Sequence, residues 1–593
     1  MNTRILFQKD TFHIMKEIVI KMKMLVFAVV ALLTSLPLTA QEARFSSPFD
    51  FPLALSANFG ELRSGHFHGG LDIKTQSTTG WPIHSPADGY ISRATVSNGG
   101  YGNAIYITHP NGYTTVYGHL EAFSKPVARK IRKYQYDNET YVTDLSFAPD
   151  EFPVKEGEVV ALSGNTGYSF GPHLHFEVRL METDEPVDPL PFFSDRISDD
   201  VPPRATSIML YPKKGRGLVN GADGKFFMEI KNGLVQQPPV LKAWGKVGAA
   251  IAAHDYMTGT TNYYGVRHVR LFVDDVLVSE SDVNRFSFDE NRMLDSWTDY
   301  EEYLLASAWY MRSTVAPSNS LRMLTVHNDD FGWVTINEER NYRFRYELTD
   351  FYGNRAVYRF TVRGERQELP AVLPDYLYYM TAGAPHILSW RDLTLWLPED
   401  ALYEDLQLDF EVRGEEGRGK REEAKEGAVP VWQFCRVPVP LKENAELRLQ
   451  MPKTLVADKS KYYIAELFNG RTICRGGTSE YGWIKTSISR LGTYTVLADT
   501  VPPRIVQEGA IPHPSPDGKG DVISFKLGDA GTGFNEYRGT IDGEWKLFKF
   551  SSKDMLLWCN LQEENIPRGH HTAEITVTDL CGNVATLAVE FEY

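Results

Sequence analysis

From Phe45 to about Asp195, apolar positions alternate with polar ones in short runs that are interrupted by glycine. Runs of this kind are typical of β-strands. Clear examples are residues 90–96, 104–107, 114–117, 158–162 and 174–179. Asn-Gly and Gly-Gly pairs separate several of them and supply the positive φ angles that tight hairpins need. The pattern therefore predicts an antiparallel β domain over residues 45–195, with no amphipathic helix longer than two turns.

The rest of the chain repeats three landmarks in the same order. Val-Pro-Pro-Arg at 201–204 recurs at 501–504, each time with an aspartate just upstream. The spacing Asp-x-x-x-Gly occurs at 255–259 and 529–533, and Asp-x-x-Gly-Asn occurs at 350–354 and 579–583. This order predicts a duplicated module, at residues 201–364 and 499–593. The alternating strands and the closing turn resemble bacterial immunoglobulin-like β-sandwich domains. A further β-rich domain is predicted between the copies, at residues 365–498.

The N-terminus has the pattern of an export signal. Lysines, the last of them Lys23, precede an apolar run at residues 25–36, and a small residue, Ala40, precedes the expected cut. The run is too short to span a bilayer comfortably, and no later apolar stretch is long enough. Residues 1–40 are therefore predicted to be a signal peptide, and the mature chain is expected to have no transmembrane span. The alternative is an uncleaved N-terminal anchor.

Composition narrows the classes of function. The chain has 593 residues and a formal net charge of −15, which argues against a nucleic-acid partner because such binding needs a basic face. The four cysteines all lie in the C-terminal third. An exported chain permits disulfides as well as free thiols, and the pairing stays open. The histidines are unevenly spread, and seven of the 15 lie between residues 66 and 175: His66, His68, His84, His109, His119, His173 and His175.

Two clusters among these residues, at 68–72 and 173–177, have a spacing that suits zinc. In the first, Gly69-Gly70 lets the chain bend so that His68 and Asp72 converge. In the second, His173 and His175 are two positions apart on a predicted strand and so share one face. A catalytic zinc uses three protein ligands and keeps one position open for water. One histidine and the aspartate of the first cluster, with one histidine of the second, supply that set. A remaining histidine can act on the water.

These clusters and the segments that join them resemble the lysostaphin/LytM-type zinc endopeptidases that cut peptidoglycan peptides. The matching blocks stand in the family's order and cover most of residues 57–190. They are FGELR (59–63), FHGGLDI (67–73), PADG (86–89), GYGN (100–103), YGHL (117–120), VKEG (154–157), SGNTG (163–167) and GPHLHFE (171–177).

The resemblance implies that His68, Asp72 and His175 are the ligands of a zinc ion (Zn²⁺). It also implies that His119 and His173 are catalytic histidines that do not bind the metal. One would act on the water and the other would stabilise the oxyanion, and the sequence does not decide which histidine has which role. The implied fold is an antiparallel β-sheet groove with zinc on its floor. His66 is the alternative ligand, although the family's block places the ligand four residues before the aspartate, which favours a position at the groove rim.

The chain is therefore predicted to be all-β, with an N-terminal antiparallel β-sheet metallopeptidase domain followed by several immunoglobulin-like β-sandwich domains. The predicted function is a secreted zinc endopeptidase that hydrolyses peptidoglycan cross-links in the periplasm, in the cell envelope or outside the cell. The alternative is a non-catalytic protein of the same fold that binds peptidoglycan or activates another hydrolase. A basic insertion contains Lys125, Arg129, Lys130, Arg132 and Lys133. It is interpreted as either a clamp for acidic stem peptides or a solvated loop.

Overall fold

The computed structural model describes residues 44–593 except for 370–377, 414–428, 453–455 and 516–519. The predicted signal peptide lies outside the described residues. Strands dominate the described chain, so the prediction of an all-β protein is confirmed. Among the described residues, no helix combines the length and the apolar character that crossing a membrane requires.

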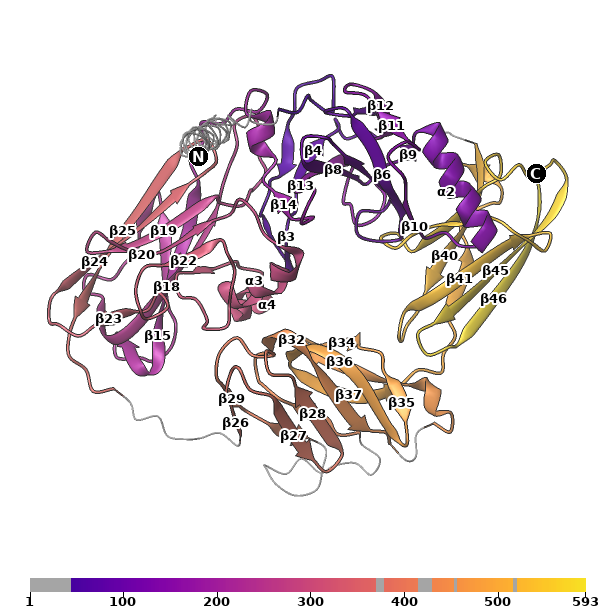
Figure 1. Cartoon of the computed structure of the whole chain (residues 1–593). Helices are drawn as coiled ribbons and strands as arrows, with labels where there is room; N and C mark the ends of the chain where they lie inside the picture. Colours follow the sequence, from indigo (N-terminus) through magenta and orange to yellow (C-terminus); the bar gives the residue numbers. More distant parts are fainter. Residues whose placement is uncertain (1–43, 370–377, 414–428, 453–455, 516–519) are drawn as a thin grey trace, which may run out of the picture. The chain divides into compact units, whose positions relative to one another are not determined.

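The N-terminal domain is built around a nine-stranded antiparallel sheet (Figure 1). Its main path runs β1 (Leu55–Ala57), β4 (Leu71–Lys74), β13 (His173–Leu180), β8 (Tyr113–Gly118), β7 (Ala104–Thr108), β6 (Gly89–Val96) and β10 (Thr143–Ser146). The strands β11 (Pro153–Val154) and β14 (Pro186–Val187) pair with β6 and β13. In the register of the central strand, His175 stands opposite Asp72 on one side and Gly118 on the other. The sheet thus brings the two predicted metal clusters together.

Smaller sheets complete this domain. The hairpin of β2 (Leu62–Arg63) and β3 (His66–Phe67) carries the chain into the first histidine cluster. A three-stranded sheet contains β5 (Pro82–His84), β12 (Val159–Leu162) and β9 (Ala122–Phe123). A 3₁₀ turn, η1 (Leu190–Phe193), ends the domain.

The prediction of no long helix in this domain is wrong, because α2 spans Lys125–Asn138. Its three buried residues, Val127, Ile131 and Gln135, recur every four positions and form one face that packs inward. Pro126 stands in the first turn, where its missing N–H costs nothing. The basic residues between the buried positions hid this narrow stripe, and they lie on a helix rather than on a loop.

The next segment forms one eleven-stranded sheet, antiparallel except for a short parallel pairing of β18 with β25. Its main path is β17 (Leu234–Val235), β16 (Phe226–Lys231), β15 (Arg204–Val219), β18 (Lys242–His254), β25 (Arg355–Gly364), β24 (Asn341–Thr349), β19 (His268–Val273), β20 (Val276–Asp282) and β22 (Leu324–Val326). The strands β21 (Met311–Arg312) and β23 (Val334–Ile336) pair with β18. The helical turns η2 (Phe288–Met293), α3 (Leu294–Trp297) and α4 (Tyr300–Ala306) lie between β20 and β21.

The hydrophobic core of this segment includes two phenylalanines of the N-terminal domain. Phe59 and Phe67 are almost fully buried within it. The ring centroids of both lie 5.3 Å from that of Phe286. The N-terminal domain and the first module therefore share one core.

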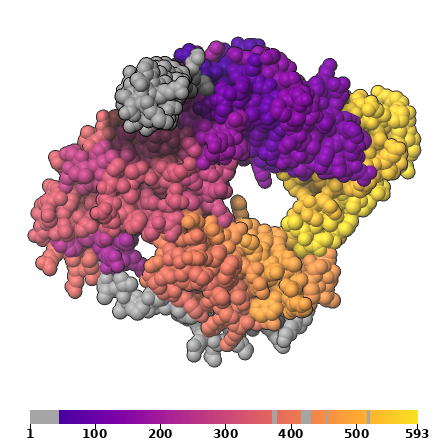
Figure 2. All heavy atoms as spheres, in the orientation of Figure 1, coloured from indigo at the N-terminus to yellow at the C-terminus, as the bar shows by residue number. Residues whose placement is uncertain are grey.

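The described residues from 378 to 498 pack as two five-stranded sheets around a common core, and they form one packed body in salmon to orange in Figure 2. One sheet contains β27 (His386–Trp390), β28 (Leu393–Leu397), β32 (Val439–Gln450), β36 (Trp483–Leu491) and β35 (Thr478–Glu480). The other contains β30 (Glu411–Arg413), β31 (Val431–Gln433), β37 (Thr493–Ala498), β33 (Tyr462–Phe468) and β34 (Arg471–Cys474). A separate pair joins β26 (Tyr378–Met380) and β29 (Leu406–Leu408), and η3 (Lys459–Lys461) precedes β33.

The last segment also has two sheets with one core between them. The first contains β38 (Arg504–Gln507), β39 (His513–Pro514), β40 (Asp521–Gly528), β44 (Leu556–Asn560) and β43 (Lys549–Ser551). The second contains β42 (Glu544–Trp545), β41 (Phe534–Ile541), β45 (His570–Asp579) and β46 (Val584–Glu592). All four cysteines of the chain are free thiols. The immunoglobulin-like character of these domains stays a prediction.

Candidate metal centre and its histidines

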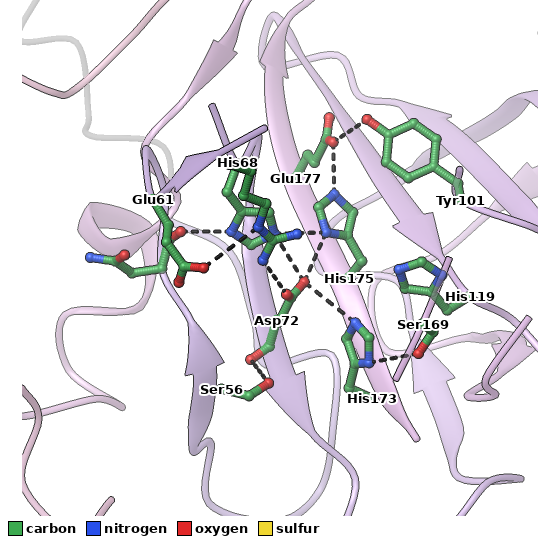
Figure 3. A network of polar contacts seen from close by, with 12 residues as sticks. Ser56, Glu61, His68, Asp72, Tyr101, His119, Ser169, His173, His175 and Glu177 are labelled. Carbon is green, nitrogen blue, oxygen red and sulfur yellow. Dashed lines mark hydrogen bonds and ion pairs between the residues drawn. The ribbon is translucent and has the colours of Figure 1, made fainter. Parts of the chain in front are cut away.

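Three of the predicted residues converge on one point between β4 and β13 (Figure 3). His68 Nε2 lies 3.0 Å from Asp72 Oδ1 and 3.0 Å from His175 Nδ1. The third distance, from His175 Nδ1 to Asp72 Oδ1, is 2.9 Å. The three residues are 2%, 7% and 4% exposed. Ligand atoms of a tetrahedral zinc with bonds of 2.0–2.1 Å lie about 3.3 Å apart. The nitrogen and oxygen donors present therefore fit zinc after shifts of a few tenths of an ångström.

The glycine pair is required by the close approach of β13. A Cβ on Gly70 would lie 2.2 Å from the carbonyl oxygen of Phe176, and one on Gly69 would lie 2.9 Å from Glu177 Oε1. Any side chain at these positions would push β4 away from β13. The glycines thus let His68 and Asp72 reach His175.

A second layer of polar groups orients the three candidate ligands. His68 Nδ1 lies 2.6 Å from the carbonyl oxygen of Asn58, so it donates a proton there and presents Nε2 to the centre. His175 Nε2 lies 2.8 Å from Glu177 Oε1, which leaves Nδ1 for the centre. Arg63 donates to Asp72 Oδ2 at 2.9 Å, which leaves Oδ1 for the centre. Such partners fix the tautomer and the ring orientation of metal-binding histidines.

The two remaining histidines flank this cluster (Figure 3). His119 follows β8 with a left-handed φ of 60°, and its Nδ1 lies 2.8 Å from the carbonyl oxygen of Thr166. His173 Nδ1 lies 2.8 Å from the carbonyl oxygen of Gly171, and its Nε2 lies 3.5 Å from Asp72 Oδ1. The ring centroids of the two histidines are 4.7 Å apart. Each ring therefore uses Nδ1 on a backbone carbonyl, and Nε2 of His173 faces Asp72.

The site favours neutral histidines at two positions and a positive charge at a third. Burial lowers the pKa of His68 to about 4, and burial with the neighbouring His175 and His173 lowers the pKa of His119 to about 3. Burial would also lower the pKa of His175, but hydrogen bonds to Asp72 and Glu177 outweigh it and raise that pKa to about 9. Two carboxylates thus attract a cation at the place where the three candidate ligands meet.

Several residues of the site were missed from the sequence. Glu177 is fully buried, and it accepts hydrogen bonds from Tyr101 Oη at 2.5 Å and Arg179 Nε at 2.6 Å. The sequence carried a signal for Glu177 and Arg179. Both alternate with His175 along β13 and so share a face with His173. Tyr101 and Arg63 come from other segments, and their approach has no local signal.

The other clustered histidines lie outside this centre. His66 is exposed on β3, and its Nδ1 lies 3.0 Å from the carbonyl oxygen of Ser64. His84 is part of β5, with Nδ1 2.9 Å from the carbonyl oxygen of Gly157. His109 is buried, and its Nε2 lies 2.7 Å from Thr115 Oγ1.

Comparison with known proteins places two family matches on the chain. Residues 66–136 match peptidase family M23, and residues 377–499 match the Zu5-like domain.

Among curated relatives, the DD-carboxypeptidase/endopeptidase Mpg of Neisseria meningitidis serogroup B is 35% identical over 147 residues, which cover 25% of this chain and 26% of the relative. The peptidoglycan DD-endopeptidase ShyC of Vibrio cholerae is 31% identical over 143 residues, which cover 23% of this chain and 27% of the relative. The glycyl-glycine endopeptidase ALE-1 of Staphylococcus capitis is 30% identical over 132 residues, which cover 22% of this chain and 30% of the relative. The chain thus spans about a quarter of the length of the relatives it matches.

Among solved structures, the catalytic domain of lysostaphin from Staphylococcus simulans is 26% identical, with a TM-score of 0.18. The match covers 23% of this chain and 89% of that domain.

Proposed function

We propose that the N-terminal domain, of which residues 66–136 match peptidase family M23, is a zinc endopeptidase that hydrolyses peptide cross-links of peptidoglycan. The observation that carries the proposal is the convergence of His68, Asp72 and His175 beside two further histidines, whose Nδ1 atoms are held by backbone carbonyls. The names of the relatives support the substrate. ShyC is called a peptidoglycan DD-endopeptidase, Mpg a DD-carboxypeptidase/endopeptidase and ALE-1 a glycyl-glycine endopeptidase.

In the proposed reaction, His68 Nε2, Asp72 Oδ1 and His175 Nδ1 would hold the zinc. When bound, zinc would supply a water of lowered pKa and would polarise the carbonyl of the scissile bond. Burial keeps His119 neutral at physiological pH, because its pKa is about 3. A neutral imidazole with a protonated Nδ1 can accept a proton at Nε2.

His119 and His173 share the proton chemistry of this proposal. The histidine that accepts the proton of the water becomes an imidazolium, which can then donate to the departing amine. The other histidine would stabilise the developing oxyanion by donating from a protonated Nε2, and the two rings lie 4.7 Å apart. The hydrogen bonds from Nδ1 to the carbonyls of Thr166 and Gly171 hold both rings in position.

We further propose that the protein is exported to the cell envelope, where its substrate lies. The predicted signal peptide supports export. The name of one relative, peptidoglycan DD-endopeptidase, supports the location in the cell envelope.

Digestion of purified sacculi tests the proposed activity. The zinc-loaded wild-type chain is expected to convert cross-linked muropeptide dimers to monomers, and mass spectrometry of the fragments would name the bond that is cut. The variant His175→Ala is expected to lose both bound zinc and activity. The variants His119→Asn and His173→Asn should retain zinc and lose about 10²–10⁴-fold in kcat.

The exposed His66 provides the matched control, because His66→Asn changes a clustered histidine outside the centre. This variant is expected to digest sacculi like the wild type. Zinc-loaded wild type that leaves the dimers intact would contradict the proposal and would favour a non-catalytic protein that binds peptidoglycan or activates another hydrolase.

A further inference from the structure

The three repeated landmarks bring aspartates together in both modules. In the first module, Asp199, Asp255 and Asp350 each offer one carboxylate oxygen, and these atoms lie within 4.8 Å of one another. In the second module, Asp499, Asp529 and Asp579 do the same. In each module the three come from the segment before Val-Pro-Pro-Arg, the loop after a central strand, and the turn between the last two strands. We call these sets the first and second aspartate clusters.

Hydrogen bonds fix the backbone around the first cluster. Asn354 Nδ2 donates to Asp350 Oδ2 at 2.7 Å and to the carbonyl oxygen of Asp199 at 3.1 Å. The N–H of Val201 donates to Asp199 Oδ1 at 3.1 Å. Thr258 also donates to Asp199 Oδ1, from its N–H at 2.8 Å.

The second cluster repeats this arrangement. Asn583 Nδ2 donates to Asp579 Oδ2 at 2.7 Å and to the carbonyl oxygen of Asp499 at 3.1 Å. The N–H of Val501 donates to Asp499 Oδ1 at 3.1 Å. The N–H of Thr532 donates to Asp499 Oδ2 at 2.9 Å. Two sequence-distant segments therefore build the same constellation of carboxylates.

Both clusters contain carboxylate oxygens that the protein leaves unsatisfied. Asp255 is 5% exposed, and its buried Oδ1 has no hydrogen-bond partner among the described residues. The same holds, within the described part of the chain, for the buried Oδ2 of Asp199 and Oδ1 of Asp529. An unpaired carboxylate oxygen away from water is costly. Backbone N–H groups donate to the other carboxylate oxygen of Asp199 and of Asp529. The oxygens that receive no donor therefore indicate a place for a bound group.

The missing partner must be positively charged. The charged groups that act on Asp255 are the carboxylates of Asp350 and Asp199. Arg267 lines the same small cavity, but its guanidinium is paired with Asp188 at 2.9 Å and Asp282 at 2.6 Å. A metal cation bound among the carboxylates would satisfy both the charge and the unpaired oxygens.

We propose that each aspartate cluster binds one Ca²⁺ ion. Calcium takes six to eight oxygen ligands in flexible geometry, which suits three carboxylates on loops and turns. Zinc prefers nitrogen and sulfur ligands, and the clusters offer oxygen. Magnesium demands near-ideal octahedral geometry and gives up its waters reluctantly. The ion joins the start of each module to its closing turn, and it is separate from the proposed zinc centre.

Calorimetric titration of the full mature chain tests the proposal. The protein is freed of metal ions by a chelating resin, reloaded with one equivalent of zinc and then titrated with CaCl₂. The wild type is expected to bind two ions per chain. Asp255→Asn and Asp529→Asn are each expected to bind one ion, and the double variant is expected to bind none.

The matched control is Asp295→Asn, which changes a carboxylate with an unpartnered Oδ1 in the described structure but outside both clusters. This variant should retain two ions. Two ions retained by Asp255→Asn or by Asp529→Asn would overturn the assignment of that residue and its cluster.

Thermal unfolding of the wild type gives a second readout that does not depend on the folding of any variant. An ion that binds the folded chain raises the unfolding temperature, so CaCl₂ should raise it and NaCl of equal ionic strength should not. An equal response to MgCl₂ would overturn the choice of calcium. A wild type that shows neither heat nor stabilisation up to about 10 mM CaCl₂ would overturn the proposal. That result would favour a protonated Asp255, because burial raises the pKa of its carboxyl group to about 8.

Discussion

At the scale of single residues, the orientation of His175 depends on Glu177, which lies two positions further along β13. Arg179 and Tyr101 hold this carboxylate, and the charges of Arg179 and His175 outweigh its burial and lower its pKa to about 2. Glu177→Gln removes the negative charge behind the imidazole. Because outer partners of this kind are worth about 10–100-fold in metal affinity, the variant is expected to bind zinc that much more weakly. Competition with a chelating dye measures the effect.

Glu185→Gln is the control for this prediction. Its carboxylate pairs with Arg285 and Arg322 and contacts none of the candidate ligands in the described structure. Zinc affinity should be unchanged in this variant. If Glu177→Gln also bound zinc like the wild type, the orientation of His175 would have to depend on β13 alone.

Asp295 in α3 makes the stability of the protein depend on pH. Burial raises the pKa of its carboxyl group to about 6 from the usual 3.8, although Arg292 and Arg490 oppose the shift. Between these values the folded chain holds a proton that the unfolded chain has lost. The contribution of Asp295 to stability therefore falls as the pH rises from about 4 to about 6, by up to about 3 kcal/mol, and stays low above that range.

Asp295→Asn should remove this dependence. The variant is expected to unfold at a higher temperature than the wild type at pH 8, with the difference shrinking towards pH 4. Thermal unfolding across this range measures it. The exposed Asp329 offers a control, since Asp329→Asn should follow the wild type at every pH. A constant difference between Asp295→Asn and the wild type would contradict the prediction.

The two clusters could be predicted from the sequence because their spacing carries geometric information, whereas the choice of His175 over His173 as a ligand came from the resemblance to the lysostaphin/LytM-type family. A strand places His173 and His175 on one face, and the glycine pair before Asp72 signals a close approach. The hydrogen bonds that choose between Nδ1 and Nε2 could not be predicted. They depend on Asn58 and on Glu177, which reach the histidines only when the strands pair.

At the scale of elements, α2 shows where the alternation of apolar and polar residues fails to predict the secondary structure. The helix buries three side chains, and charged residues fill most of its other positions. Lys130 pairs with Glu151 at 2.8 Å and Lys133 pairs with Asp137 at 2.6 Å, so part of the basic charge is already neutralised. The helix is therefore held by its packing rather than by a long apolar stripe.

Ile131→Ala tests this interpretation of α2. Removing a buried isoleucine side chain costs about 2 to 4 kcal/mol. Hydrogen exchange is expected to show lower protection of the amides in α2, with the central sheet unaffected. Arg129→Ala, at an exposed position of the same helix, should leave the protection unchanged. Equal protection in Ile131→Ala and the wild type would mean that other contacts hold the helix.

At the scale of the whole molecule, the core that the N-terminal domain shares with the first module could not be predicted. The duplication stays a prediction, which rests on repeated landmarks in the same order. Phe59 and Phe67 belong to blocks that also serve the metal site, so nothing local shows that they are buried against Phe286. Long-range packing of this kind leaves no periodic signal.

The shared core predicts that the N-terminal domain is not stable on its own. A fragment of residues 44–200 would expose Phe59 and Phe67, each worth about 1.5 to 3 kcal/mol of burial. It would also lose the two hydrogen bonds between Asn58 and Gly265, at 2.9 and 2.8 Å, which hold the residue whose carbonyl orients His68. The fragment is therefore expected to unfold at a lower temperature and to bind zinc more weakly than residues 44–366. Because the longer fragment retains the whole first module, it should match the full chain in zinc affinity. Equal unfolding temperatures for the two fragments would show that the N-terminal domain is stable without its neighbour.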